Sequence, residues 1–210
     1  MDDYIIKIKE IHLTIKDRIQ SRLSEFRQTG WTGRDEDIFA ELVFCILTPQ
    51  SRAKSCWKAV ENLIEKNLLF KGDKDKIAKE LFGVRFKNNK SRYIVEARKS
   101  FADISNLFRG SKDIYKKREW LVQNIKGIGY KEASHFLRNI GLGENLAILD
   151  RHILKNLKLL KVIDKIPKLL LKEKYLTIEE RMRKFSEDIK IPMSHLDLVL
   201  WYKETGEIFK

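Results

Sequence analysis

The segment from residue 113 to residue 140 constrains the fold most, because two predicted helices there are separated by only a few residues. Apolar side chains recur at threes and fours over 113–125 and again over Lys131–Ile140, which is helical spacing. Between them, Gly127 and Gly129 allow a sharp hairpin, since glycine adopts a positive φ without a steric penalty. The hairpin also presents the backbone N–H groups of a helix N-terminus, which can bind an anion such as phosphate.

Helical periodicity also dominates the rest of the chain. Further helices are predicted over residues 3–27, 35–47, 53–65, 75–81, 91–107, 151–160, 177–189 and 194–203. We expect the first of these helices to end at 29–33 and Ser51 to cap the third. Thr177 and Glu180 are spaced as a capping box. Little of the sequence alternates as a strand does, so the fold class is predicted to be all-α.

The charge balance bounds the class of partner. Lysine and arginine total 43 against 30 aspartate and glutamate residues, a formal net charge of +13. This excess favours a polyanionic partner, with nucleic acid ahead of a membrane surface. The alternative is the highly charged surface of a thermophilic protein. Since no run of about 18 apolar residues and no signal peptide are present, we expect a cytoplasmic protein with no membrane partner.

Cysteine usage bears on cofactors. Cys45 and Cys56 lie in apolar helical patterns and are expected to be reduced core residues. Two cysteines are too few for the four thiolates of an iron–sulfur cluster. We therefore predict no metal site and no other cofactor.

Two charged residues are candidates for chemistry. Lys131 lies at the start of the second hairpin helix, where the helix dipole and partial burial disfavour a protonated amine. A free amine there is suited to a Schiff-base nucleophile, and the alternative is a lysine that binds phosphate or is merely solvated. Asp150 precedes the helix at 151–160 and is expected to cap its N-terminus. The same ionised carboxylate is suited to stabilising an oxocarbenium-like transition state.

The spacing of these residues resembles that of one enzyme superfamily. The pattern I-x-G-x-G-x-K at 125–131, followed by L-D-x-H-I at 149–153, is similar to that of the helix-hairpin-helix DNA glycosylases. The resemblance implies that Lys131 and Asp150 are the catalytic pair. A hairpin of this kind that only binds DNA does not require both residues.

The resemblance also implies an architecture and a DNA contact. One unit spanning 1–210 is expected, with one lobe from about 1–30 with 150–210, another from 31–149, and the hairpin at the cleft between them. Lys126, Gly127 and Gly129 are expected to bind the phosphates of one DNA strand. Lys126 stands where relatives often have proline, and the carbonyls of the turn are a candidate site for a monovalent cation.

Outside the hairpin, the resemblance is to a narrower family. The segments L-T-P-Q-S at 47–51, V-R-F-K-N-N-K-S-R-Y at 84–93 and P-M-S-H-L-D-L-V-L-W-Y-K at 192–203 look like the compact type-2 8-oxoguanine DNA glycosylases of archaea and some thermophilic bacteria. By this resemblance Gln50 fills the gap left by an extruded base, and the alternative is an ordinary polar loop residue. The likeness covers nearly the whole chain.

The same family implies a pocket for the extruded base. Phe86 and Trp201 are expected to stack on its faces, with Asp197 and Lys210 as readers of its polar edge. Trp201 has the alternative of being a core residue, and Lys210 that of a frayed terminus. Ser194 and His195 are further pocket candidates.

The expected function is a bifunctional DNA repair glycosylase that acts as a monomer on double-stranded DNA containing oxidised guanine. It would excise 8-oxoguanine through a Schiff base on Lys131 and cleave the abasic strand by β-elimination. Three alternatives stay open at this point: a glycosylase for another oxidised or mispaired base, a non-catalytic DNA-binding module, and a basic scaffold that binds acidic protein.

Overall fold

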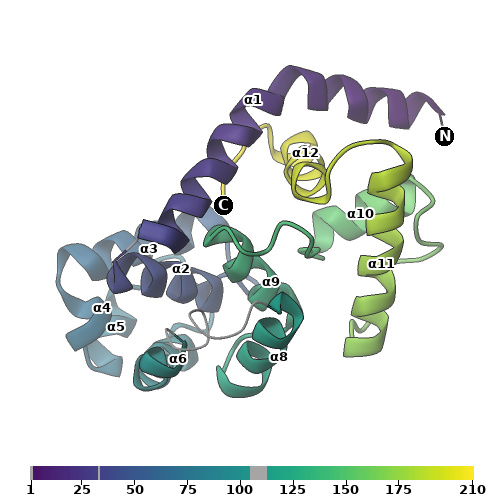
Figure 1. The fold of residues 1–210 in the computed structure, drawn as a ribbon. Coiled ribbons are helices and arrows are strands. Elements are labelled where there is room, and N and C mark those ends of the chain that lie inside the picture. The colour runs from purple at the N-terminus through teal and green to yellow at the C-terminus, as the bar shows by residue number, and fades with distance from the viewer. Residues whose placement is uncertain (1, 33, 105–112) are drawn as a thin grey trace.

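The computed structural model describes residues 2–32, 34–104 and 113–210 (Figure 1). Its helices are α1 (Asp2–Thr32), α2 (Asp35–Leu47), α3 (Ala53–Glu65), α4 (Leu68–Lys71), α5 (Lys74–Glu80), α6 (Lys87–Lys99), α8 (Ile114–Asn124), α9 (Tyr130–Asn139), α10 (Arg151–Leu159), α11 (Lys172–Asp188) and α12 (Met193–Thr205). Within the described ranges there is no strand, which confirms the all-α prediction. No helix among the described residues has the length and apolar character that crossing a membrane requires.

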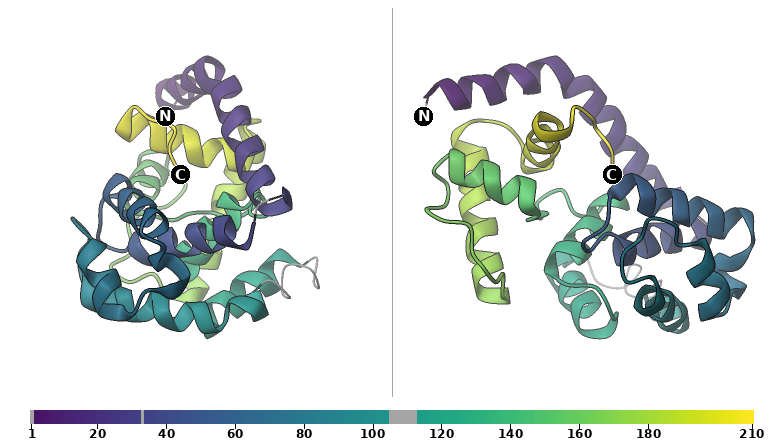
Figure 2. Two further views of the ribbon diagram at one scale, coloured as in Figure 1. Left: turned by 90° about the vertical axis from the view of Figure 1, so that its left-hand side faces the viewer. Right: turned by 180° about the vertical axis from the view of Figure 1, so that it is seen from behind.

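Buried apolar side chains form two clusters. The first is built mainly from α2 to α6, α8 and α9, and the second from α1, α10, α11 and α12. The two groups of helices lie side by side in Figure 1 and in the right-hand view of Figure 2. Within the first cluster α2 is central, because every residue from Phe39 to Leu47 is buried. The two clusters are consistent with a chain of two lobes. The division at the predicted bounds, about 1–30 with 150–210 and 31–149, stays a prediction.

Helix α1 is longer than the sequence indicates, and it spans both groups of helices. It contacts α12 along one part of its length and α9 and α2 along another (Figures 1 and 2). The helix predicted over 3–27 was too short, since α1 continues through Gly30 and ends at Thr32, within the segment 29–33 that was expected to end it. A Cβ on Gly30 would lie 2.0 Å from the carbonyl oxygen of Ile140, so this glycine permits close packing against the end of α9.

Two capping predictions were also wrong. The N-cap of α3 is Arg52, and the Ser51 hydroxyl instead accepts hydrogen bonds from the Lys90 ammonium and the Arg85 amide. Helix α11 begins at Lys172, so Thr177 lies inside it and its hydroxyl donates to the Glu173 carbonyl. Residues 105–107, at the end of the helix predicted over 91–107, lie outside the described residues.

Candidate active site

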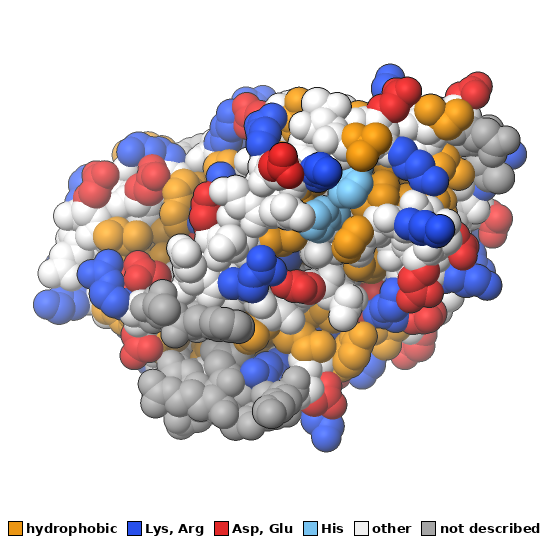
Figure 3. All heavy atoms as spheres, turned by 45° about the horizontal axis from the view of Figure 1, so that its top comes forward, with side chains coloured by type: hydrophobic (Ala, Val, Ile, Leu, Met, Phe, Trp, Pro, Cys, Tyr) orange, Lys and Arg blue, Asp and Glu red, His pale blue; other side chains and the backbone are white. Residues whose placement is uncertain are grey.

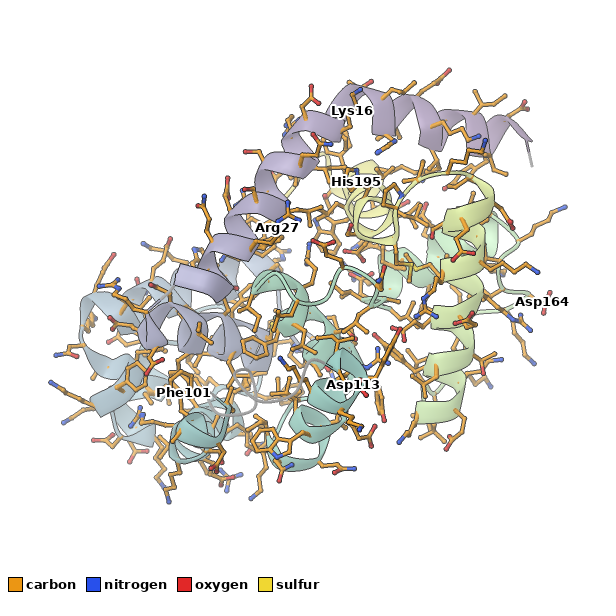
Figure 4. All side chains as sticks on the ribbon, viewed as in Figure 1. Lys16, Arg27, Phe101, Asp113, Asp164 and His195 are labelled. Carbon is orange, nitrogen blue, oxygen red and sulfur yellow. The ribbon has the colours of Figure 1, made fainter. Side chains whose placement is uncertain are left out.

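The hairpin predicted at 113–140 is present, with α8 and α9 joined by Ile125–Gly129. Asp113 caps α8 through hydrogen bonds from the amides of Tyr115 and Lys116 (Figure 4 labels Asp113). Gly127 has a φ of +83°, and a Cβ there would lie 2.7 Å from the Tyr93 ring. A glycine is therefore required at this position for two reasons, backbone conformation and space.

Part of the predicted phosphate-binding surface is already engaged inside the protein. The Gly129 amide donates to the Glu132 carboxylate at 3.2 Å, and this carboxylate completes the N-terminal turn of α9. The Lys126 ammonium lies 3.0 Å from Glu96 across an exposed ion pair. Exposed pairs of this kind contribute little to stability, so Lys126 can exchange Glu96 for a phosphate at small cost.

Lys131 lies in the first turn of α9, and about a fifth of its side chain is exposed. Its ammonium donates to the Thr48 hydroxyl at 3.3 Å and lies 3.7 Å from Glu132. Thr48 is the C-cap of α2, and its hydroxyl donates in turn to the carbonyl of Cys45. Sequence reasoning used Thr48 only as the end of a helix and missed its contact with Lys131, because the two residues are 83 positions apart in the chain.

Asp150 caps α10, as predicted. One carboxylate oxygen accepts hydrogen bonds from the amides of His152 and Ile153, both at 2.8 Å. These two amides are among the unpaired donors of a helix N-terminus, so the cap holds the carboxylate in a fixed direction. The second carboxylate oxygen takes no part in the cap.

Asp197 links the surroundings of Lys131 and Asp150. It is buried on α12 and lies 3.9 Å from the guanidinium of Arg138 on α9. Burial raises the pKa of its carboxyl to about 6, against the opposing charge of Arg138. Asp150 raises this pKa further and Lys131 lowers it, so both predicted catalytic residues are within electrostatic reach of Asp197.

Trp201 lies beside the start of α10. Its ring meets the His152 ring edge to face, with centroids 5.2 Å apart and an interplanar angle of 88°. The ring is half-buried and is therefore not one of the fully enclosed core side chains. His152 therefore contacts both residues, the Trp201 ring through its side chain and the Asp150 carboxylate through its backbone amide.

Lys210 is packed against the first cluster of helices. Its ammonium pairs with Glu41 on α2 and lies 3.4 Å from the centroid of the Trp57 ring. The preceding Phe209 packs against the same cluster. The contacts of this tail differ from those of a frayed terminus. Sequence reasoning missed Glu41, although an acidic residue inside the apolar run F-A-E-L-V-F-C-I-L is a visible signal.

His135 is a second residue that sequence reasoning missed. It is buried one turn after Lys131 on α9, and no well-formed hydrogen bond reaches either ring nitrogen, although the backbone of Lys210 lies close by. Burial, with the nearby charges of Lys131 and Arg138, lowers its pKa well below the usual value, so the ring is neutral. The backbone of Lys210 acts in the opposite direction on this pKa, which places the tail beside the ring.

Gln50 and Phe86 lie together on the surface and share an uncommon backbone conformation. Their φ angles are +56° and +58°, in the left-handed region. Both side chains are exposed, and 54% of Phe86 is accessible. The two loops are joined by the hydrogen bond from the Arg85 amide to the Ser51 hydroxyl. Among the described residues, no ring contact joins Phe86 to Trp201.

His195 faces away from this group. Its Nδ1 lies 3.0 Å from Nε2 of His12 on α1, so one of the two neutral rings donates to the other. Figure 4 labels His195 where α12 approaches α1, and Figure 3 shows histidine side chains in pale blue on this face among interspersed charges. The structure thus engages His195 with α1 and not with Lys131.

Comparison with known proteins decides the family. A family model described as 8-oxoguanine DNA glycosylase matches residues 19–191. This chain belongs to that family. An "8-oxoguanine DNA glycosylase/AP lyase" from Fusobacterium nucleatum is 49% identical to it, with 100% of this chain and 99% of the relative covered. A relative of the same description from Methanocaldococcus jannaschii is 40% identical over 98% of this chain and 99% of its own length. The family resemblance in the sequence is confirmed.

Solved structures of this glycosylase family share the fold. The crystal structure of the 8-oxoguanine DNA glycosylase of Thermotoga maritima has a TM-score of 0.92 at 37% identity, with both chains fully covered. The Methanocaldococcus jannaschii enzyme in complex with a 15mer DNA containing 8-oxoguanine has a TM-score of 0.90 at 39% identity. The match covers 98% of this chain and 99% of that one.

Cysteine and metal chemistry can be placed last. Cys45 and Cys56 are free and buried, and burial raises the pKa of the Cys56 thiol to about 11. The prediction that both are reduced core residues is confirmed. Over the described part of the chain, no group of three or more His, Cys, Asp or Glu side chains is arranged to hold a metal ion.

Proposed function

We propose that this protein is an 8-oxoguanine DNA glycosylase with abasic-site lyase activity. The observation that carries the proposal is Lys131 in the first turn of the hairpin's second helix, together with the capping carboxylate of Asp150 in a family of this description. Relatives named for both activities match essentially the whole chain, which supports both for this protein. The partner is double-stranded DNA that contains oxidised guanine, and the protein acts on it as a monomer.

The first step breaks the bond between the sugar and the base. The free amine of Lys131 attacks C1′ of the deoxyribose, and the bond from C1′ to the base nitrogen breaks. The base leaves with the bonding electron pair and takes up a proton. Asp150 stabilises the positive charge that develops on the sugar, because the α10 amides hold its carboxylate in a fixed direction.

The second step cleaves the strand. The lysine adduct loses a proton as the sugar ring opens, with the ring oxygen taking up the electron pair and a proton, and a Schiff base forms. Loss of a proton from C2′ then expels the 3′ phosphate by β-elimination. Water releases Lys131 from the imine afterwards. Water is the one co-reactant that the two steps consume.

The surrounding residues divide into two sets. Trp201 stacks on the extruded base near its attachment to the sugar, and Asp197 and Lys210 face its polar edge. The Lys210 ammonium is engaged by Glu41, so the side of Lys210 that faces His135 is its backbone. Phe86 completes the aromatic contacts of this set.

The second set contacts the duplex. The residues proposed for it are Gln50, which fills the gap left by the base, and Lys126, Gly127 and Gly129, which contact phosphates. We assign both sets to one cleft between two lobes, about 1–30 with 150–210 and 31–149. Phosphate contacts and the net charge of +13 supply sequence-independent affinity.

Borohydride trapping tests this proposal. The substrates are a duplex with one 8-oxoguanine opposite cytosine, an undamaged duplex and a duplex with an oxidised pyrimidine. We expect a covalent adduct on the 8-oxoguanine duplex alone, and none with Lys131→Gln. Lys66→Gln is the matched control, because Lys66 is an exposed lysine that pairs with Glu80 outside the proposed site. An adduct mainly on the pyrimidine duplex would show that an oxidised pyrimidine, and not 8-oxoguanine, is the substrate. Undiminished trapping by Lys131→Gln would exclude Lys131 as the nucleophile.

A further inference from the structure

Lys90 is a buried cation to which no function is yet assigned. It lies on α6 with 4% of its surface exposed, and none of the ion pairs among the described residues includes it. Its ammonium donates to the carbonyls of Leu47 and Pro49, both at 2.7 Å, and to the Ser51 hydroxyl at 3.1 Å. All three donor sites of the ammonium are thus used by one short segment, 47–51.

The position of these acceptors explains how the charge is tolerated without a carboxylate. Leu47 is the last residue of α2, and the carbonyls at a helix C-terminus carry a partial negative charge. Burial still lowers the pKa of Lys90, as expected where oxygen dipoles replace water. Burying a cation costs free energy, which the three hydrogen bonds to segment 47–51 offset only in part. The arrangement therefore suggests that Lys90 fixes the conformation of this segment.

The same network reaches a second loop. The Ser51 hydroxyl accepts from Lys90 and also from the Arg85 amide at 3.0 Å. Gln50 precedes Ser51, and Phe86 follows Arg85. Each of these two neighbours has a left-handed backbone conformation, which persists only where the surroundings impose it. One ammonium and one hydroxyl therefore join the two backbone segments that carry these exposed side chains.

We propose that Lys90 is a positioning residue that couples the Gln50 loop to the Phe86 loop, so that Gln50 at the gap in the duplex and Phe86 at the extruded base meet the DNA as one rigid unit. This inference rests on the proposed function, because it assigns the two side chains to DNA. It predicts that the contributions of Gln50 and Phe86 to DNA affinity depend on each other.

Lys90→Met is the direct test, because methionine keeps the length of the side chain and removes the three N–H donors. We expect kcat/KM on the 8-oxoguanine duplex to fall about tenfold, the effect of losing hydrogen bonds to a charged group. Arg98→Met is the matched control. Arg98 lies on the same helix and also donates to carbonyls, those of Leu68, Leu69 and Gly72, but its contacts are remote from Gln50. A loss equal to that of Lys90→Met would mean that both variants act only through stability.

Coupling is measured with Gln50→Asn and Phe86→Asn, since asparagine tolerates a left-handed conformation and removes the tip of each side chain. In the natural background, the loss of duplex affinity in the double variant should differ from the product of the single losses by at least about threefold. In the Lys90→Met background, the loss of duplex affinity in the double variant should equal the product of the two single losses. Independent losses in the natural background would overturn the proposal.

Hydrogen exchange separates this inference from the proposed function, because it needs no DNA. Peptides covering 47–51 and 82–90 should both exchange faster in Lys90→Met, and neither should change in Arg98→Met. If both loops respond but no duplex is processed by the natural protein, the coupling stands and the enzymatic assignment fails. If only one loop or neither responds, Lys90 does not couple them and the proposal is wrong.

Discussion

The guanidinium of Arg118 on α8 donates two hydrogen bonds to the carboxylate of Glu179 on α11, at 2.6 and 2.9 Å. Both side chains are almost fully buried, with 2% and 3% exposed. The same carboxylate accepts the Ala147 amide at 2.8 Å, three residues before Asp150. This one ion pair thus connects the first helix of the hairpin to the segment that leads to the predicted catalytic aspartate.

Glu179→Gln should destabilise the protein by about 3 kcal/mol, because it leaves the buried charge of Arg118 without a counterion. Urea denaturation measures this change, with an unchanged slope expected because the surface exposed on unfolding stays the same. Glu180→Gln is the control, since the neighbouring Glu180 is 70% exposed. A cost below about 1 kcal/mol would show that the pair contributes no more than a surface pair.

Asp150 has two roles, and two substitutions separate them. Asp150→Asn keeps an oxygen that can cap α10, so stability should change little while trapping falls steeply from the loss of negative charge. Asp150→Ala removes the cap as well and should cost about 1 kcal/mol of stability in addition. Thermal unfolding and borohydride trapping of both variants measure the two effects. Equal trapping by Asp150→Asn and the natural protein would exclude a catalytic role for Asp150 and leave it only the role of capping α10.

Local sequence signals identified the main helices and the hairpin. The bounds predicted for α2 and α3 agree with the structure, because each lies between clear breaks such as Thr48-Pro49. The order I-x-G-x-G-x-K was specific enough to place Lys131 in the first turn of α9 and to give the family. These features depend on residues close in the chain, which a single sequence displays directly.

Contacts between distant residues could not be predicted in this way. Gly30 reads as a helix break until Ile140 is known to pack against it. The partners of Lys90 and Lys210 lie 39 or more residues away in the chain, and nothing in the local pattern names them. The left-handed conformation of Gln50 and Phe86 was likewise invisible, because neither residue type favours it.

Asp197 should give stability a specific pH dependence. Its pKa is raised from 3.8 to about 6 in the folded protein, so between these values the folded state holds a proton that the unfolded state has released. Its stabilising contribution is therefore complete below pH 3.8 and is lost as the pH rises through about 6. The difference between these two pKa values corresponds to about 3 kcal/mol.

Asp197→Asn should remove this dependence. The free energy of unfolding of the natural protein, minus that of Asp197→Asn, should fall by up to about 3 kcal/mol between pH 4 and pH 7. The two proteins must be compared because other carboxyls change the free energy of unfolding with pH in the opposite direction. Glu204, for example, has a pKa lowered to about 2 by Lys155 and Lys203, and its contribution is lost as the pH falls. A difference curve that is flat from pH 4 to pH 7 would contradict the burial of an ionisable Asp197.

The crossing of α1 and α9 makes a final prediction about Gly30. In an exposed helix, Gly→Ala stabilises by about 1 kcal/mol because alanine has the higher helix propensity. Here an added Cβ would meet the Ile140 carbonyl oxygen at 2.0 Å and its carbon at 3.0 Å, and backbone atoms cannot move aside as a side chain does. We therefore expect Gly30→Ala to cost about 2–4 kcal/mol in urea denaturation.

Gly206→Ala is the matched control for this substitution, because it separates crowding from backbone strain. Gly206 has a φ of +75°, but no atom lies within 4 Å of an added Cβ. Its replacement should cost only about 1 kcal/mol, the penalty for a left-handed alanine. If Gly30→Ala were as mild as Gly206→Ala, α1 would be free to move away from α9, and the two groups of helices would be joined less tightly than the packed glycine indicates.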